Sequence, residues 1–124
     1  MAAGIIGVVA MVATLLPMGA TSNSAGPRTL TLVVRDMTFY MEGNPEPNPT
    51  IVLKAGELVK LHLRNEDAGM RHDFAIKSWD VTTRMLEDRG EEDTISFRVP
   101  DTAGPTPYIC TPHAKMMSGT LRVE

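Results

Sequence analysis

The chain has 124 residues, a length that suits one domain. Apolar side chains make up 43% of the sequence and charged side chains 22%, which is ordinary for a globular protein. The formal net charge is −3 and no basic stripe runs along the chain, so the sequence offers no surface for nucleic acid. The single cysteine, Cys110, excludes an internal disulfide.

The N-terminal stretch is strongly apolar, because residues 2–20 carry no charged side chain. A helix rising about 1.5 Å per residue over this stretch nearly covers a hydrocarbon layer of about 30 Å. A cleaved signal peptide and an uncleaved membrane anchor both fit this pattern. A signal peptide usually opens with Lys or Arg, but the first basic residue here is Arg28. We therefore favour one transmembrane helix as an anchor over residues 1–20, followed by a flexible linker over residues 21–27.

From Arg28 on, apolar and polar side chains alternate in several short runs, the period expected of half-buried strands. These runs centre on Leu32, Leu61, Phe97 and Leu121. Three prolines predict a loop over residues 43–50. In the second run His62 falls on the polar face, so we interpret it as a surface histidine and not as a metal ligand.

The remaining segments are less regular. Residues 70–76 are expected to form a short strand with His72 at its start, and residues 78–90 either a short helix or an irregular crossover. A turn-rich approach over residues 101–107 is expected to lead into a last short strand at Tyr108–Cys110. Short strands separated by turn signals predict an all-β sandwich.

One loop before the closing strand collects soft metal ligands: Cys110, His113, Met116 and Met117. Taken alone, a free cysteine is usually a small buried hydrophobe, and neighbouring methionines usually fill gaps in a core. A thiolate, an imidazole and a thioether within eight positions together favour copper over hard cations. A blue-copper site needs a second histidine, and the best candidate is His72.

Two motifs carry a resemblance to a known family. Cys-Thr-Pro-His followed by Met-x-Gly-Thr, over residues 110–120, resembles the ligand loop of the cupredoxins, the plastocyanin, amicyanin, pseudoazurin and azurin group. Residues 48–57 and Asn65 are similar to the middle strands of that family, and residues 71–74 resemble the segment with its first histidine ligand. The likeness spans about residues 28–124 and implies a Greek-key β-sandwich that forms a copper-binding domain.

The resemblance implies one type 1 copper ion. Its expected ligands are His72, Cys110, His113 and Met117. Met117 lies two residues before a glycine, as the methionine ligand does in the family. Met116 would give the shorter spacing of amicyanin-like loops and is the alternative.

One position departs from the family pattern. The residue after the first histidine is commonly Asn in cupredoxins and is Asp73 here. In the family this Asn ties the two ligand-bearing segments together, so a contact between Asp73 and Thr111 is left open. The single cysteine argues against a dinuclear copper site, which by the resemblance needs two bridging thiolates.

These expectations favour a one-electron carrier that serves a redox partner protein or a membrane respiratory or photosynthetic electron-transport complex. His113 is the expected electron port, because small or apolar side chains surround it in sequence. A copper-binding module for storage, delivery or sensing is the alternative. A copper nitrite reductase does not fit, because such enzymes need a second domain and further histidines, and only His62 is left over. The resemblance also places the membrane-anchored copper domain on the periplasmic, extracytoplasmic side.

Overall fold

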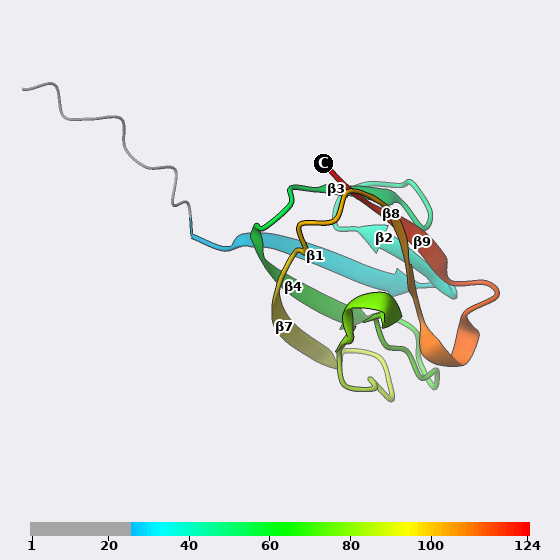
Figure 1. Cartoon of the computed structure of the whole chain (residues 1–124). Coiled ribbons are helices and arrows are strands. Elements are labelled where there is room, and N and C mark those ends of the chain that lie inside the picture. Colours follow the sequence, from blue (N-terminus) through cyan, green and yellow to red (C-terminus); the bar gives the residue numbers. More distant parts are fainter. Residues whose placement is uncertain (1–25) are drawn as a thin grey trace, which may run out of the picture.

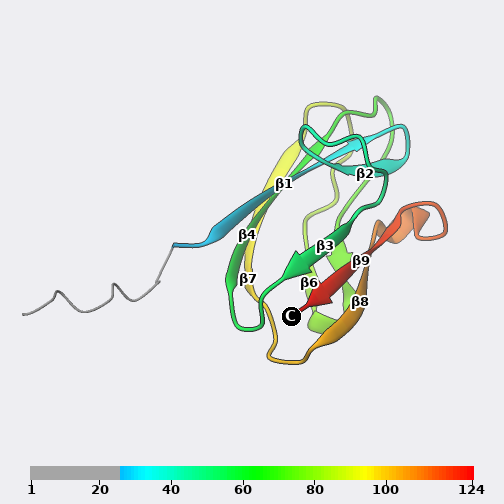
Figure 2. The same ribbon diagram turned by 90° about the horizontal axis from the view of Figure 1, so that it is seen from above.

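The computed structural model describes residues 26–124, which form two β-sheets packed face to face (Figures 1 and 2). The first sheet has the order β2-β1-β4-β7 and the second the order β3-β9-β8-β5-β6. The first sheet contains β1 (Arg28–Arg35), β2 (Thr38–Met41), β4 (Leu58–Asn65) and β7 (Glu92–Arg98). The second contains β3 (Thr50–Leu53), β5 (Ala75–Ile76), β6 (Val81–Thr82), β8 (Gly104–Ile109) and β9 (Ser118–Val123). Two short 3₁₀ helices, η1 (Lys77–Trp79) and η2 (Thr111–His113), complete the fold, and the predicted all-β sandwich is confirmed.

The predicted membrane anchor over residues 1–20, and the linker as far as residue 25, lie outside the described residues. Within residues 26–124, no helix is both long and apolar enough to span a membrane. β1 begins at the end of the sandwich opposite the loop that joins β8 to β9 (Figures 1 and 2). The loop with the candidate ligands therefore points away from the point where the chain enters the domain.

The alternating runs form strands because one face of each run is buried between the sheets. In β4 the buried apolar side chains are Val59, Leu61 and Leu63, and each contributes about 1.5–3 kcal/mol when fully buried. His62 lies between them on the outer face, where its Nδ1 is 2.8 Å from the Thr94 hydroxyl. The interpretation of His62 as a surface histidine is therefore confirmed.

The segment that carries His72 is not a continuous strand, so the predicted strand over residues 70–76 is wrong except for β5. His72 instead forms an isolated bridge with Leu86: the His72 N–H donates to the Leu86 carbonyl at 2.9 Å, and the Leu86 N–H donates back at 2.8 Å. Residues 78–90 form the irregular crossover, which contains β6 and all of η1 except its first residue. This crossover supplies the backbone partner that holds the His72 segment in place.

The expectation of a turn-rich approach over residues 101–107 is wrong in its second half, because β8 already begins at Gly104 and contains Pro105 and Pro107. Proline cannot donate a ladder hydrogen bond, so it is tolerated in a strand only where no partner needs its N–H. β8 pairs with β9 along its length, but with β5 only through Ile109. On the side away from β9, the first part of β8 therefore has no partner strand, so it can accommodate both prolines.

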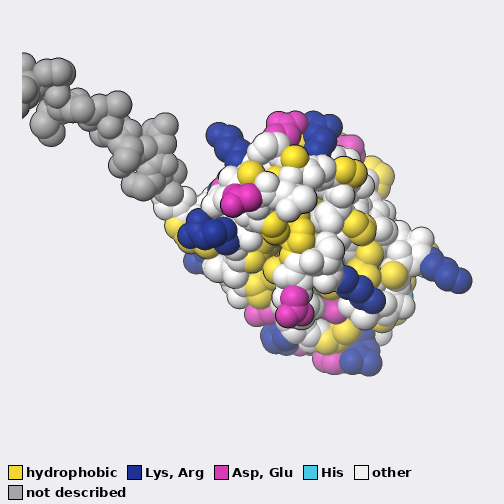
Figure 3. Space-filling view, viewed as in Figure 1, with side chains coloured by type: hydrophobic (Ala, Val, Ile, Leu, Met, Phe, Trp, Pro, Cys, Tyr) yellow, Lys and Arg dark blue, Asp and Glu magenta, His cyan; other side chains and the backbone are white. Residues whose placement is uncertain are grey.

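Charged side chains on the face shown in Figure 3 are mixed in sign, with Lys and Arg interspersed among Asp and Glu around apolar side chains. A mixed distribution agrees with the small net charge of −3. This face therefore has no large field of one sign that would steer a charged partner.

Candidate metal centre

Three side chains meet between the β8–β9 loop and the segment before β5. Among residues 26–124, the only group of three or more His, Cys, Asp or Glu side chains that could share a metal ion is His72, Cys110 and His113, whose ligating atoms lie within 4.8 Å of one another. Sγ of Cys110 is 3.6 Å from Nδ1 of His72 and 3.7 Å from Nδ1 of His113. The fold thus brings together residues that lie 38 positions apart in the sequence.

These distances fit one metal ion that binds Cys110 and both histidines. Metal–nitrogen bonds of about 2.0–2.1 Å and a metal–sulfur bond of about 2.3 Å, at tetrahedral to trigonal angles, would hold sulfur and nitrogen about 3.6–3.8 Å apart. The Sγ–Nδ1 distances of 3.6 and 3.7 Å match that value. One thiolate and two imidazoles form a soft donor set that suits copper.

The two candidate methionines differ sharply in exposure. Met117 is 0% exposed and belongs to the hydrophobic core, whereas Met116 is 63% exposed. The backbone of Met117 lies beside that of Cys110, because the Met117 carbonyl accepts the Cys110 N–H at 3.0 Å. A thioether that contributes to an enclosed site must itself be enclosed, so the burial favours Met117 over Met116.

Hydrogen bonds between its own backbone groups hold the loop between Cys110 and Met117 in shape. Pro112 lies in η2, where a missing N–H costs nothing because the first N–H groups of a helix lack intrahelical partners. The His113 N–H donates to the Cys110 carbonyl at 3.1 Å, and the N–H groups of Met116 and Met117 both donate to the His113 carbonyl at 2.9 Å. The short spacing between Cys110 and His113 is therefore the spacing of one tight turn.

A group of three aromatic rings supports both ligand segments. Phe74 lies two residues after His72 and Tyr108 two residues before Cys110, and their rings stack with centroids 5.3 Å apart. Phe39 packs edge-on against both rings, at 6.1 and 5.4 Å. Aromatic pairs add about 0.5–1.5 kcal/mol beyond the area they bury. The stacked rings therefore join the two ligand segments inside the core.

The glycine of the Met-x-Gly motif has a packing role. Gly119 lies opposite Tyr108 in the β8–β9 ladder. A Cβ atom at Gly119 would overlap the Tyr108 ring. The Tyr108 hydroxyl, at the far end of this ring, donates to the Pro49 carbonyl at 2.6 Å. Gly119 thus leaves room for the tyrosine that anchors the strand before Cys110.

Asp73 makes the contact that the sequence left open. Its Oδ1 accepts the Thr111 N–H at 2.6 Å, and its Oδ2 accepts the Thr111 hydroxyl at 2.8 Å. Asp73 is only 5% exposed, so both bonds are largely shielded from water. The departure from the family's Asn therefore keeps the link between the two ligand segments.

Burial shifts the pKa values of two candidate ligands in opposite directions. Burial raises the pKa of the Cys110 thiol, although backbone N–H groups of Asp73 and His113 act to lower it. Burial also lowers the pKa of His72, although the Asp67 carboxylate acts to raise it. Both shifts favour the neutral forms of Cys110 and His72 in the metal-free site, so metal binding would release the thiol proton.

Two residues near the site were not anticipated from the sequence. Oδ2 of Asp67 is 2.9 Å from Nε2 of His72, the ring nitrogen that faces away from Cys110. Asn48 joins β2 to the loop, since its Oδ1 accepts the Phe39 N–H at 3.0 Å and its Nδ2 donates to the Met116 carbonyl at 3.3 Å. A signal for Asp67 does exist, because an acidic residue in a turn just before a candidate ligand is well placed to bond it.

Comparisons with known proteins agree with this geometry. A family model described as copper binding proteins, plastocyanin/azurin family, matches residues 48–124. Auracyanin A, a "blue" copper protein from the green thermophilic photosynthetic bacterium Chloroflexus aurantiacus, superposes with a TM-score of 0.60 at 19% identity, covering 80% of this chain and 100% of auracyanin A. Auracyanin B gives a TM-score of 0.61 at 22% identity, with 83% of this chain and 93% of auracyanin B covered. Comparison with curated protein sequences gave no match.

At 19% and 22% identity, the structural likeness shows the fold. The family model matches well over half of the chain and therefore shows the family. The His-Cys-His group beside buried Met117 fits one type 1 copper ion. The chain belongs to the plastocyanin/azurin family of copper-binding proteins, the cupredoxins.

Proposed function

We propose that this protein is a one-electron carrier whose type 1 copper is held by His72, Cys110, His113 and Met117. The observation that carries the proposal is the pair of Sγ–Nδ1 distances, 3.6 and 3.7 Å, around a cysteine that is 0% exposed. Copper in such a site supplies one reversible oxidation step. The protein supplies ligands whose positions are already set before the ion binds.

The surrounding contacts explain how the ligands stay in place. His72 is held by its bridge to Leu86, Cys110 by its bond to the Met117 carbonyl, and the two segments by the Asp73–Thr111 bonds. A site that changes little between two oxidation states has little to reorganise when an electron moves. Restrained ligands therefore favour rapid electron transfer.

His113 is the proposed electron port. It is the only one of the three clustered ligands that is partly exposed. A hollow on the same loop is lined by Pro112, His113, Ala114, Lys115 and Met116. Mostly small or apolar side chains around a partly exposed ligand suit a weak, transient contact with a redox partner, and Lys115 adds a charge that can steer it.

The partner is proposed to be a redox protein or a membrane electron-transport complex, met on the periplasmic side. The apolar residues 2–20 support a membrane anchor. Because the ligand loop lies at the end opposite the start of β1 (Figures 1 and 2), an anchored domain would present its copper away from its own attachment point. This arrangement favours a partner that contacts the domain at the end opposite its attachment point.

The absorption spectrum of the copper-loaded protein tests the proposal. A strong visible thiolate-to-copper band at one copper per chain is expected, and Cys110→Ser should abolish it. A protein that binds copper without this band would instead be a storage, delivery or sensing module. A solved multicopper oxidase shares the fold at 13% identity, but the chain covers only 26% of that protein. The fold therefore also occurs in an enzyme, so the carrier proposal depends on the site and not on the fold.

A matched pair of substitutions tests the docking patch. Ala114→Glu places a charge beside His113, and Ala103→Glu places the same charge on an exposed loop before β8, at the other end of that strand. Ala114→Glu should slow electron transfer to a redox partner without bleaching the copper, while Ala103→Glu should not. Equal rates for the two variants would remove the patch from the proposal.

A further inference from the structure

The ring of His72 is held at both nitrogens. Its Nδ1 faces Sγ of Cys110 at 3.6 Å, and its Nε2 is 2.9 Å from Oδ2 of Asp67. A carboxylate accepts hydrogen bonds and donates none, so the hydrogen on this ring lies on Nε2 and is donated to Asp67. That leaves the Nδ1 lone pair free and directed toward the position a metal would take.

The same carboxylate holds a strained turn. Oδ1 of Asp67 accepts the Asp36 N–H at 2.7 Å, and Oδ2 accepts the Met37 N–H at 3.0 Å. Asp36 and Met37 connect β1 to β2 and have φ values of 51° and 58°, in the left-handed region that non-glycine residues seldom adopt. Asp67 therefore joins the β1–β2 turn to the imidazole of His72.

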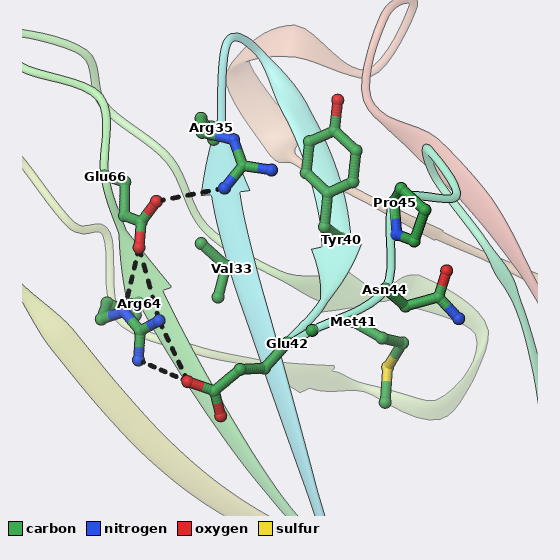
Figure 4. Close-up of a pocket in the computed structure, with 10 residues that line it drawn as sticks. Val33, Arg35, Tyr40, Met41, Glu42, Asn44, Pro45, Arg64 and Glu66 are labelled. Carbon is green, nitrogen blue, oxygen red and sulfur yellow. Dashed lines mark hydrogen bonds and ion pairs between the residues drawn. The ribbon is translucent and has the colours of Figure 1, made fainter.

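The neighbouring carboxylate is engaged elsewhere. Glu66 pairs with Arg35 at 3.6 Å and with Arg64 at 3.4 Å on the outer surface, and Figure 4 shows these ion pairs. The Glu66 side chain is 35% exposed, whereas the Asp67 side chain is 12% exposed. Two consecutive acidic residues thus have separate partners, and only Asp67 contacts the His72 ring.

We propose that Asp67 is a positioning residue for the copper site: it fixes His72 with Nδ1 toward the copper, and its charge stabilises Cu(II) more than Cu(I). The second half rests on the proposed function, because it requires His72 to be a ligand. Carboxylates that bond the far nitrogen of a metal-bound histidine orient the ring and increase its basicity as a ligand. A negative charge close to the site favours the more positive oxidation state.

The first test uses the copper-free protein and does not depend on copper chemistry. Nitrogen-15 NMR of the His72 ring should show hydrogen on Nε2 in the wild type and a mixture of the two tautomers in Asp67→Ala. Asp36→Asn is the control, since it removes a charge from the same turn and leaves the His72 contact intact. Hydrogen on Nδ1 in the wild type, or the same single tautomer in Asp67→Ala, would overturn the proposal.

The second test measures copper affinity and reduction potential in Asp67→Asn, which keeps the size of the side chain if Asp67→Ala fails to fold. Loss of a group that orients a metal-bound histidine typically weakens metal binding about 10–100-fold. Cu(II) affinity should fall in this range and Cu(I) affinity less, so the potential should rise by about 59 mV for each tenfold difference.

Asp36→Asn should leave both quantities within twofold of the wild type. If Asp36→Asn changed the copper affinity and the potential equally, the effect would come from the general electrostatic field of the turn. That result would contradict a positioning role. An unchanged potential and affinity in Asp67→Asn would contradict it as well. If the wild type showed no thiolate-to-copper band, the proposed function would fail, but the tautomer result would still decide the role of Asp67.

Discussion

The two segments that meet at the copper site are held in different ways. The loop from Cys110 to Met117 is closed by bonds between its own backbone groups. The segment from Asp67 to Phe74 instead depends on partners elsewhere in the chain, including Leu86 and Thr83 in the crossover. One ligand segment is therefore specified by local spacing, while the other is specified by the tertiary fold.

The largest effect is expected from Phe74→Ala, which removes the ring that joins the two segments. Truncating a buried phenylalanine costs about 3–5 kcal/mol of unfolding free energy. Phe97→Ala is the matched control, because Phe97 is also buried but its ring lies tilted against Trp79 and not against Tyr108. Urea denaturation should show both variants destabilised, with copper binding weakened only in Phe74→Ala. Equal copper affinity in the two variants would contradict a role for the ring in positioning the ligands.

Asp73→Ala should have the next largest effect on stability, since it breaks two hydrogen bonds to Thr111. Hydrogen bonds to a charged group contribute about 1.5–3 kcal/mol each, so we expect a loss of about 3 kcal/mol or more. Asp73→Asn should lose far less, because its amide can accept the Thr111 N–H and donate to the Thr111 hydroxyl. Thermal and urea unfolding of the copper-loaded variants measures both. An Asn variant as unstable as the Ala variant would show that the negative charge of Asp73 is essential.

A smaller effect is expected from pH in the copper-free protein. Burial lowers the pKa of His72 below its ordinary value of 6.5, so the unfolded chain binds a proton more readily than the folded one. As pH falls below 6.5 toward the lower folded pKa, this residue should cost at most about 1.4 kcal/mol per pH unit. Urea denaturation at several pH values, compared with His72→Gln, isolates the effect. Identical pH profiles would contradict a buried neutral imidazole.

The smallest effect is expected from Pro112→Ala within the loop. Proline has no N–H, so it cannot donate a hydrogen bond to the Cys110 thiolate. An added donor worth about 0.5–1.5 kcal/mol would withdraw charge from sulfur and raise the reduction potential by about 20–60 mV. Cyclic voltammetry measures this change. A potential that stays the same or falls would count against this account of the loop.

The difference between the segments also explains what the sequence could predict. Cys110 and His113 could be named as candidates because they lie close together on one turn, whereas Met117 was preferred to Met116 by the family resemblance. Alternation predicted most strands because each buries one face. The strand over residues 70–76 was wrong because His72 pairs through the crossover, whose sequence has no clear period. The early start of β8 was missed because Pro105 and Pro107 suggest a loop unless the open edge of the strand is known.

The sequence held a signal near each of Asp67 and Asp73, but the actual bonds of both side chains could be found only in the fold. Each aspartate acts on a group far along the chain or across a turn, and no periodicity marks such a pair. Asp67 in particular contacts a turn 31 positions earlier in the sequence.

Assignment of His72, Cys110, His113 and Met117 as the copper ligands stays a prediction.

An anomalous copper map from crystals of the intact protein tests that assignment most directly. We expect one copper peak per chain, at about 2.0–2.3 Å from Sγ of Cys110 and from Nδ1 of both His72 and His113, with Met117 as the remaining ligand. A peak bound at other residues, or a peak at Cys110 that His72 does not reach, would contradict the account.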